Sequence, residues 1–405
     1  MGRRLSRTFT LLAALAGLAA CVADPGAVGY GRPAPLVLAP QLPRPGPPTP
    51  AGAGRRVALL LPLTGANAEL GQAMLKAAQL VLDQPGAPPL DPRDTGGTPE
   101  GAAMAARAAL DGGAGIILGP LTAGETAAAG PVARAAGVPV LAFTSDPAQA
   151  QPGVWTMGIT PAQQARRLVR AIQAEGKTRV AAVVPQNAFG DALANGLLAA
   201  ASAAALPEPR IVRHPAGFAA LDTALRDVAG VSQRRGTGPA LASAAPPGPS
   251  PVDVLLLGDA GGVLNQAVPL LKFYDIGTDR VRILGPALWA RQAAQLGGLA
   301  GAWYAAPDPA ARGGFEQQYA AKYATPPRDL TSLVYDSAAV ARALAGPTGF
   351  PVAALTRPEG FTGADGVFVL QPDGQVRRGL AVFEIDATGA HIVQPAPQSL
   401  TTPES

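Results

Sequence analysis

The chain has 405 residues with 32 basic and 28 acidic side chains, a net charge of +4 at pH 7, and a single cysteine, Cys21. One cysteine excludes an intrachain disulfide, so the fold depends on its core alone. Arg3, Arg4 and Arg7 stand near the start of the chain, and subtracting these three charges from +4 leaves +1 for the rest. The rest has no basic run interleaved with aromatic residues, which argues against a nucleic-acid partner.

The first segment of the sequence is predicted to be a secretion signal. The three arginines precede an almost wholly apolar run from Phe9 to Leu18, about ten residues long, whereas a membrane-spanning helix needs about 20. The motif Leu18-Ala19-Ala20-Cys21 resembles a bacterial lipobox, in which the cysteine is acylated. We therefore expect residues 1–20 to be a lipoprotein signal peptide and Cys21 to carry the only membrane anchor. The alternative is an ordinary signal peptide that ends near a cysteine.

Residues 21–54 are predicted to form a tether. Prolines and glycines dominate this stretch, as in GRPAPLVLAPQLPRPGPPTPAGAG, and no apolar periodicity runs through it. Proline-rich segments act as extended spacers of roughly 3 Å per residue, so about thirty residues hold a domain some tens of ångströms from a bilayer. Val22 is not the aspartate that usually retains bacterial lipoproteins at the inner membrane, so we expect a periplasmic protein anchored in the outer membrane.

Strand–helix units begin after the tether. Continuous apolar runs are typical of strands that are buried on both faces of a parallel sheet. Such runs occur at Val57–Leu61, Ala114–Gly119 and Val138–Phe143. Helices are predicted between and after them, beginning at the caps Asn67, Thr98 and Thr122, and Thr122 with Glu125 fits a capping box. The alternation of strands and helices predicts an α/β fold with helices on both faces of a parallel sheet.

A second series of units follows. Its predicted strands are Arg179–Val184, Arg210–His214, Val252–Asp259 and Val281–Gly285, and its first helix begins at Thr160 with Gln163 in a capping box. Further along, Gly366–Leu370 and Leu380–Ile385 are predicted strands joined by a hairpin turn at Asp373-Gly374. About 350 residues are more than a single hydrophobic core usually accommodates. We therefore expect two doubly wound parallel-sheet lobes joined by a hinge near 155–160.

Residues from about Arg55 to Ile385 resemble the type I periplasmic-binding fold, in its leucine/isoleucine/valine-binding branch. The resemblance is carried by VALLLPLTGANAELGQAMLKAAQLVL, RDTGGTPEGAAMAARAAL, IILGPLTAGETAAAGPVARAAGVPVLAFTSD, NAFGDAL and VYDSAAVARAL. The wording of DTGGTPEGA and GFTGADGVFVLQPDGQVRRGLAVFEI further resembles the lipoproteins that activate penicillin-binding proteins. The family implies a first lobe of 55–157 plus 305–362, a second lobe of 158–304 plus 363–388, and a tail of 389–405.

The sequence offers no catalytic motif. It holds no Gly-x-Ser-x-Gly elbow, no His-Glu-x-x-His and no phosphate-loop lysine, and its two histidines, His214 and His391, stand far apart. We therefore expect a protein that is not an enzyme and that binds neither a cofactor nor a metal.

A ligand cleft is predicted where the strands end, because ligands of doubly wound sheets bind beyond the carboxyl ends of the strands. The first-lobe residues predicted to contact a ligand are Thr64, Gly65, Thr122, Phe143, Thr144 and Ser145. Hydroxyl groups and the free N–H groups at the start of a helix suit a carboxylate, as in a small amino-acid-like ligand. For Thr122, the alternative is that it only caps its helix.

Two positions depart from the amino-acid receptors of the resembled family. Phe189 precedes Gly190 where the family often has a tyrosine. Pro286 and Ala287 stand where an importer receptor offers an acid to the ammonium of its ligand, and Asp259 is the candidate substitute. Burying an ammonium without a counter-charge costs several kcal/mol, so these departures argue against a standard amino acid.

Two functions remain open. One is a regulatory lipoprotein that contacts a cell-wall synthase in the periplasm, and the other is a solute receptor that delivers a small ligand to the permease of an ABC importer. The departures and the long tether favour the regulator, whereas the hydroxyl groups of the first lobe favour the receptor.

Overall fold

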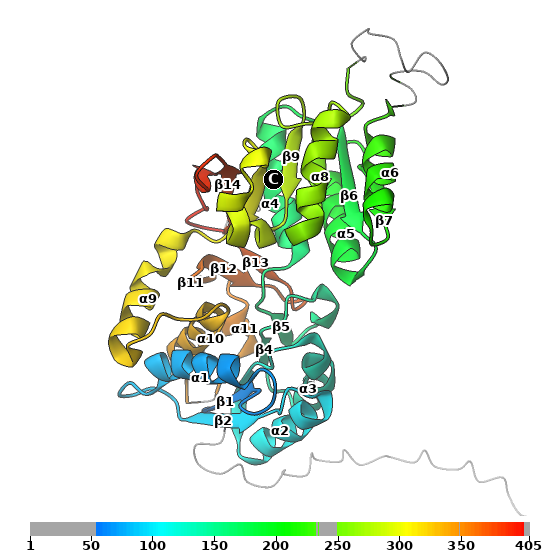
Figure 1. Cartoon of the computed structure of the whole chain (residues 1–405). Coiled ribbons are helices and arrows are strands. Elements are labelled where there is room, and N and C mark those ends of the chain that lie inside the picture. Colours follow the sequence, from blue (N-terminus) through cyan, green and yellow to red (C-terminus); the bar gives the residue numbers. More distant parts are fainter. Residues whose placement is uncertain (1–53, 232–233, 235–248, 348, 401–405) are drawn as a thin grey trace, which may run out of the picture. The chain divides into compact units, whose positions relative to one another are not determined.

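The structure is a computed structural model that describes residues 54–231, 234, 249–347 and 349–400. The predicted signal peptide, Cys21 and all but the last residue of the predicted tether lie outside these residues. Two α/β lobes make up the described part of the chain (Figure 1). In that part, no helix has the length and the apolar character that crossing a membrane requires.

The first sheet has five parallel strands in the order β2-β1-β3-β4-β5. The strands are β1 (Arg56–Leu61), β2 (Leu90–Asp94), β3 (Ala114–Leu118), β4 (Val140–Ala142) and β5 (Val154–Thr156). Helices α1 (Ala68–Leu82), α2 (Pro99–Asp111) and α3 (Ala123–Ala135) connect the first four strands, and the short helix η1 (Pro147–Gln149) precedes β5. The three predicted strands of this lobe are confirmed as β1, β3 and β4.

Alternate residues of these strands point to opposite faces of the sheet, so one layer of packed side chains lies between the sheet and the helices on each face. Ala58 and Leu60 of β1 pack with the alanines of α2 and α3 on one face. Val57, Leu59 and Leu61 pack with α1 on the other face, together with helices from much later in the chain. Burial on both faces explains why these strands appear in the sequence as continuous apolar runs.

Side chains at the helix starts confirm two of the three predicted caps of this lobe. The hydroxyl of Thr98 accepts a hydrogen bond from the Gly101 N–H at 3.0 Å. Thr122 and Glu125 form the predicted capping box. Asn67 is confirmed as the N-cap position of α1, but its backbone (φ −101, ψ 13) is not extended and its side chain makes no capping hydrogen bond.

The second sheet has seven strands in the order β15-β14-β10-β9-β8-β6-β7. They are β6 (Val180–Pro185), β7 (Arg210–His214), β8 (Val254–Leu257), β9 (Arg282–Gly285), β10 (Trp303–Ala306), β14 (Ala381–Ile385) and β15 (Ala390–Gln394). The first five are parallel, and β14 and β15 are antiparallel to their neighbours. The four predicted strands of this series are confirmed as β6 to β9.

Helices cover both faces of this sheet as well. They are α4 (Pro161–Ala174), α5 (Ala188–Ala203), α6 (Phe218–Val228) and α8 (Gly261–Phe273), with the short helices η3 (Ala287–Gln295) and η4 (Gly297–Leu299). Helices α4 and α5 pack on one face, and α6, α8 and η3 pack on the other. The capping box of Thr160 and Gln163 at the start of α4 is confirmed.

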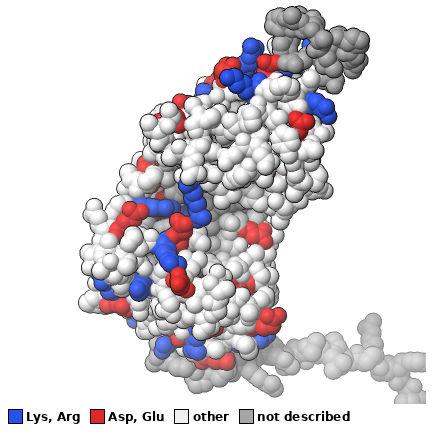
Figure 2. Space-filling model, in the orientation of Figure 1, with Lys and Arg blue, Asp and Glu red and all other residues white. Residues whose placement is uncertain are grey.

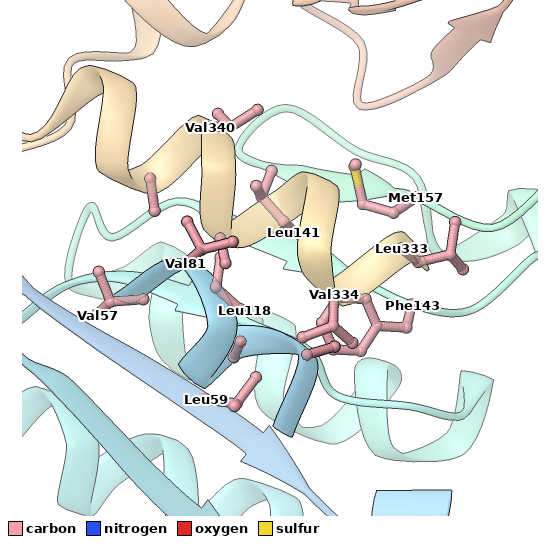
Figure 3. Packing of buried hydrophobic residues seen from close by; sticks show 14 of the residues in the cluster. Val57, Leu59, Val81, Leu118, Leu141, Phe143, Met157, Leu333, Val334 and Val340 are labelled. Carbon is pink, nitrogen blue, oxygen red and sulfur yellow. The ribbon is translucent and has the colours of Figure 1, made fainter. Parts of the chain in front are cut away.

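The chain then returns to the first lobe. Helices α9 (Pro309–Tyr323), α10 (Thr331–Leu344) and α11 (Val352–Leu355) contribute to the same core as α1, and Figure 3 shows Leu333, Val334 and Val340 of α10 among the side chains of the first sheet. The hydroxyls of Tyr319 and Tyr323 donate hydrogen bonds to carbonyl oxygens of α1 at 3.2 Å and 2.8 Å.

A third, antiparallel sheet follows α11. Its strands are β11 (Phe361–Gly363), β12 (Gly366–Leu370) and β13 (Val376–Arg378). The predicted turn at Asp373-Gly374 therefore joins β12 to β13, and the predicted pairing of Gly366–Leu370 with Leu380–Ile385 is wrong, because β14 instead pairs with β10 and β15 of the second sheet.

The predicted domain bounds stay a prediction. The packing of two strands near the end of the chain bears on these bounds. Phe368 and Leu370 of β12, which fall in the predicted second-lobe range, pack in the core of the first sheet. Strand β15 lies within the range predicted as a tail. Each lobe is thus assembled from segments that are far apart in the sequence.

Candidate functional site

A cleft of about 570 Å³ lies between residues of the two lobes. Leu121 and Phe143 come from the first lobe, and Ile159, Phe189 and Leu288 come from the second. Most of its lining is apolar, with a small number of polar groups. Its size and composition are typical of a small-molecule site, and it lies where strands of both sheets end.

Three of the predicted ligand residues line the cleft together, directly after strand β4. Phe143 is almost fully buried, with 2% of its surface exposed. The hydroxyl of Thr144 accepts a hydrogen bond from the Asp146 N–H at 3.0 Å. Ser145 is exposed to the cleft, and its hydroxyl has no hydrogen-bond partner among the described residues. The hydroxyl of Ser145 is therefore available to a ligand.

The chain crosses between the lobes at Gly158, which also borders the cleft. Its N–H donates a hydrogen bond to the carbonyl oxygen of Thr144 at 3.1 Å. A Cβ atom at this position would lie 2.6 Å from that oxygen and 2.7 Å from the backbone nitrogen of Ser145. These distances are too short for any other residue unless the backbone moves, so the crossover requires glycine.

Two ion pairs supply the charged groups of the cleft. The Arg312 Nε of α9 lies 2.5 Å from Asp365 Oδ1, and the Ser332 hydroxyl donates to Asp365 Oδ2 at 2.8 Å. Arg291 of η3 pairs with Asp329, which precedes α10, at 2.5 Å. The second pair joins the two lobes. Both carboxylates that line the cleft are thus paired with arginines.

Behind the cleft, Arg378 and Asp336 form a fully buried pair. The Arg378 Nη2 donates to the carbonyl oxygen of Met157 at 3.0 Å, next to the crossover. Asp336 Oδ1 accepts from the Ala364 N–H at 2.6 Å, and its Oδ2 lies 3.7 Å from Arg378 Nη1. Burial raises the pKa of Asp336 to about 7, an effect that Asp365 increases and Arg378 opposes.

The predicted residues Thr64, Gly65 and Thr122 do not line this cleft. The Thr64 hydroxyl donates to Asp94 Oδ2 at 2.6 Å, in the turn where Gly65 has a φ of +80. The Thr122 hydroxyl accepts from the Glu125 N–H at 3.3 Å, as the capping alternative predicts.

Asp259 lies in a second cavity, of about 440 Å³, at the ends of β6, β7 and β8. Its Oδ2 is 2.9 Å from His214 Nε2, both side chains are buried, and its carbonyl oxygen accepts from Trp289 Nε1 at 2.8 Å. Phe189 and Leu288 line both this cavity and the cleft. Asp259 is therefore not among the acids that line the cleft.

A groove of about 590 Å³ on the first lobe is bordered by α1, α9 and α10. Tyr335 and Arg342 of α10 line it together with Gln84, which follows α1, and no strand ends there. We take the cleft between the lobes as the candidate site, because it combines strand ends, a glycine crossover and buried charges. Among the described residues, no cluster of three or more His, Cys, Asp or Glu side chains could hold a metal ion.

Sequence reasoning misses the charged residues of the cleft. Arg312 and Asp365 are separated by 53 positions, and Arg291 and Asp329 by 38. No local pattern marks any of them. The one available signal is general: Arg312 stands in the first turn of a helix that follows directly on strand β10.

Two doubly wound lobes with a mostly apolar cleft between them define a two-lobed protein that binds small molecules. The chain belongs to the periplasmic binding protein family, which matches residues 55–390. The family match confirms the resemblance found in the sequence, and the structure confirms the α/β fold with two parallel-sheet lobes.

Solved structures of this fold share little sequence with the chain. A protein from Rhodospirillum rubrum described as a branched-chain amino acid ABC transporter is 19% identical, with a TM-score of 0.66, over 84% of this chain and 99% of that one. Full-length LpoA from Haemophilus influenzae is 16% identical, with a TM-score of 0.62, over 84% of this chain and 59% of LpoA. An ABC transporter substrate-binding protein from Desulfitobacterium hafniense in complex with Leu is 16% identical, with a TM-score of 0.59, over 84% and 99% of the two chains. No curated protein matches the sequence.

Proposed function

We propose that this periplasmic binding protein is a non-catalytic lipoprotein that regulates a peptidoglycan-synthesising penicillin-binding protein. The observation that carries the proposal is the pairing of charges in the cleft, where Asp329 and Asp365 are both paired with arginines. Asp365 is buried and is held by Arg312 and Ser332, so its carboxylate is not free to receive the ammonium group of an α-amino acid, and the other carboxylate of the cleft, Asp329, is 68% exposed. Phe189 also lacks the hydroxyl group that amino-acid receptors of this fold often present.

The sequence supplies the rest of the support. Cys21 in its lipobox and the proline-rich residues 21–54 suit a domain that reaches a membrane-bound partner from the outer membrane. The resemblance of DTGGTPEGA and of residues 360–385 to penicillin-binding-protein activators points to the same class of partner. On this proposal the partner contacts an outer surface of the lobes and not the cleft.

A penicillin-labelling experiment tests the proposal. Membranes that contain the full-length chain are crosslinked, the chain is recovered, and bound synthases are detected by a fluorescent penicillin that labels their active-site serine. We expect a labelled protein to co-purify with the wild type, with a Ser145→Trp variant that fills the cleft, and with the matched Ser145→Ala control. If no labelled protein co-purifies with the wild type, the regulator proposal is wrong.

The alternative is a receptor that delivers an amino acid or a similar solute to an ABC importer. The cleft itself favours this function, because it is open and about 570 Å³ in volume and presents the hydroxyl of Ser145, which has no hydrogen-bond partner among the described residues. Calorimetry with the twenty standard amino acids distinguishes the two. Measurable binding of an amino acid that Ser145→Trp abolishes would support the receptor and contradict the regulator.

A further inference from the structure

Residues 395–400, the strap, follow strand β15 of the second sheet and lie against the last crossover between the lobes. This crossover is at Gly379, because Val376 packs in the core of the first sheet and Leu380 packs in the core of the second. None of the strap residues lines the cleft. The strap can therefore influence the cleft only through the positions of the two lobes.

Arg167 of α4 holds the beginning of the strap. Its Nη2 donates a hydrogen bond to the carbonyl oxygen of Pro395 at 3.4 Å, and its Nη1 donates to Oε1 of Gln394, the last residue of β15, at 2.9 Å. The Nε of the same guanidinium donates to the carbonyl oxygen of Leu380, next to the crossover, at 2.8 Å. One side chain of the second lobe thus joins the start of the strap to the crossover.

Arg377 of β13 holds the other end of the strap. Its Nη2 donates a hydrogen bond to the carbonyl oxygen of Leu400, a residue with only 3% of its surface exposed. Strand β13 packs with the first lobe, and Arg378 of the same strand pairs with Asp336 of α10. On the face shown in Figure 2, basic side chains lie beside acidic ones. Arg167 and Arg377 differ, because neither forms an ion pair with a residue that the structure describes and both donate to carbonyl oxygens of the strap.

The middle of the strap packs on the crossover itself. A Cβ atom at Gly379 would lie 3.0 Å both from the carbonyl oxygen of Pro397 and from Cγ2 of Val367. Gly379 does not have a positive φ, so close packing and not an unusual backbone leaves little room for a side chain there. The rings of Pro395 and Pro397 fix φ at about −65° and restrict the residue before each proline. The strap is therefore a stiff connection between its two ends.

We propose that the strap ties the two lobes together across the last crossover and limits their movement relative to each other. Such movement changes the backbone angles of the segments that cross between the lobes, whereas the stiff strap keeps Pro395 and Leu400 at a nearly constant separation. Because Arg167 and Arg377 come from different lobes, a large movement must break the hydrogen bond at one end of the strap. The inference goes beyond the proposed regulatory role and is independent of it, because the lobes of a regulator and of a receptor can both be restrained in this way.

Two spin labels measure the movement directly. Arg107→Cys on α2 and Thr223→Cys on α6 place one label on an exposed position of each lobe, and Cys21→Ser makes these the only thiols of the full-length chain. Double electron–electron resonance then gives the distribution of distances between the labels. We expect a narrow distribution for the chain with the strap, and a broader one when a stop codon at Pro395 removes it.

Point variants test the contacts without shortening the chain. Arg377→Gln removes the hydrogen bond at the first-lobe end, and Gly379→Ala places a methyl group where Pro397 packs, so both are expected to broaden the distance distribution. Arg280→Gln and Gly262→Ala are the matched controls. Arg280 is an exposed arginine far from the strap in sequence, and a Cβ atom at Gly262 would meet nothing within 4 Å. Both controls are expected to keep the narrow distribution.

Hydrogen exchange shows where the chain loosens. The N–H groups of Gly158, at the first crossover, and Gly379 donate to the carbonyl oxygens of Thr144 and Val367. In Arg377→Gln, peptides that contain these two glycines are expected to exchange roughly 10- to 100-fold faster, as expected when a hydrogen bond to a charged group is lost. Peptides from β8, in the interior of the second sheet, are expected to exchange at the wild-type rate.

The proposal is wrong if removal of the strap leaves the distance distribution unchanged, or if Arg377→Gln has no more effect than Arg280→Gln. It is equally wrong if exchange in β8 rises as much as exchange at the crossovers, because that pattern indicates a general loss of stability. Thermal unfolding checks the fold of each variant, and if the truncated chain does not fold, the two point variants decide. The recovery of a penicillin-labelled partner tests the regulatory role separately, so either proposal can fail alone.

Discussion

Asp336→Asn is expected to change how the stability of the protein depends on pH. The Asp336 side chain is fully buried, and burial, with a contribution from Asp365, raises its pKa from 3.8 to about 7 against the opposing charge of Arg378. A carboxyl group whose pKa is higher in the folded than in the unfolded protein holds its proton more tightly when folded. Its contribution to stability is therefore complete below about pH 4 and is lost as the pH rises through about 7. A shift of roughly 3 pKa units corresponds to about 4 kcal/mol in the free energy of unfolding.

Urea unfolding at several pH values measures this effect. From about pH 5 to about pH 8, Asp336 is expected to lower the free energy of unfolding of the wild type by roughly 3 kcal/mol. Asparagine keeps the shape of the side chain and can accept the Ala364 hydrogen bond, but it does not titrate, so Asp336→Asn should lack this part of the pH dependence. Titrating groups that do not interact with Asp336 cancel in the difference between the two proteins.

Asp386→Asn is the control for this measurement. Hydrogen bonds from Thr388 and His391 hold the pKa of Asp386 down to about 2, and its contribution is therefore present above pH 4 and lost only as the pH falls further. This variant should keep the wild-type slope between about pH 5 and about pH 8. If Asp336→Asn and the wild type lose stability in parallel over that range, the raised pKa of Asp336 is refuted.

Three further substitutions test the anchor, the crossover and a helix cap. Cys21→Ser is expected to prevent incorporation of labelled palmitate and to release the protein from membranes, and continued labelling would contradict the lipobox prediction. Gly158→Ala is expected to lower the free energy of unfolding by about 1–3 kcal/mol, because its Cβ would lie 2.6 Å from the carbonyl oxygen of Thr144, and an unchanged urea midpoint would argue against this contact. Thr160→Ala is expected to cost about 1 kcal/mol in the same assay by removing the cap bonded to Gln163, whereas Thr160→Ser should cost less; equal losses would show that the hydroxyl is not what matters.

The sequence predicts the central strands β1, β3, β6, β8 and β9, but it also finds β7 at an edge of the second sheet and misses β10 in the interior of that sheet. Burial on both faces requires continuous apolar runs such as Val57–Leu61, and these runs are visible without a structure. Strand β2 (LDPRD) lies at the edge of the first sheet and contains a proline and three charged residues, so nothing in its composition indicates a strand. Strand β15 (AHIVQ) at an edge of the second sheet is also missed; none of its residues is buried, so it has no continuous apolar run.

Some residues of the candidate site can be predicted from their neighbours in the sequence, whereas others are brought together only by the folded chain. Phe143, Thr144 and Ser145 can be predicted because they directly follow a recognisable strand, and strand ends are where ligands bind. The bond between Arg312 and Asp365 joins α9 to the loop between β11 and β12, and only the folded chain brings these segments together. Charged pairs of this kind have no periodicity that a sequence reader could find.

The return of the chain to the first lobe also sets the order in which the protein can fold during synthesis. The core around Val57 includes Phe368, which is made more than 300 residues later. The first sheet therefore cannot close its core while the second lobe is being translated, and the emerging chain keeps apolar surface exposed. Contacts this distant form slowly, so the chain stays in a partly open state for longer after its synthesis than a protein with local contacts would.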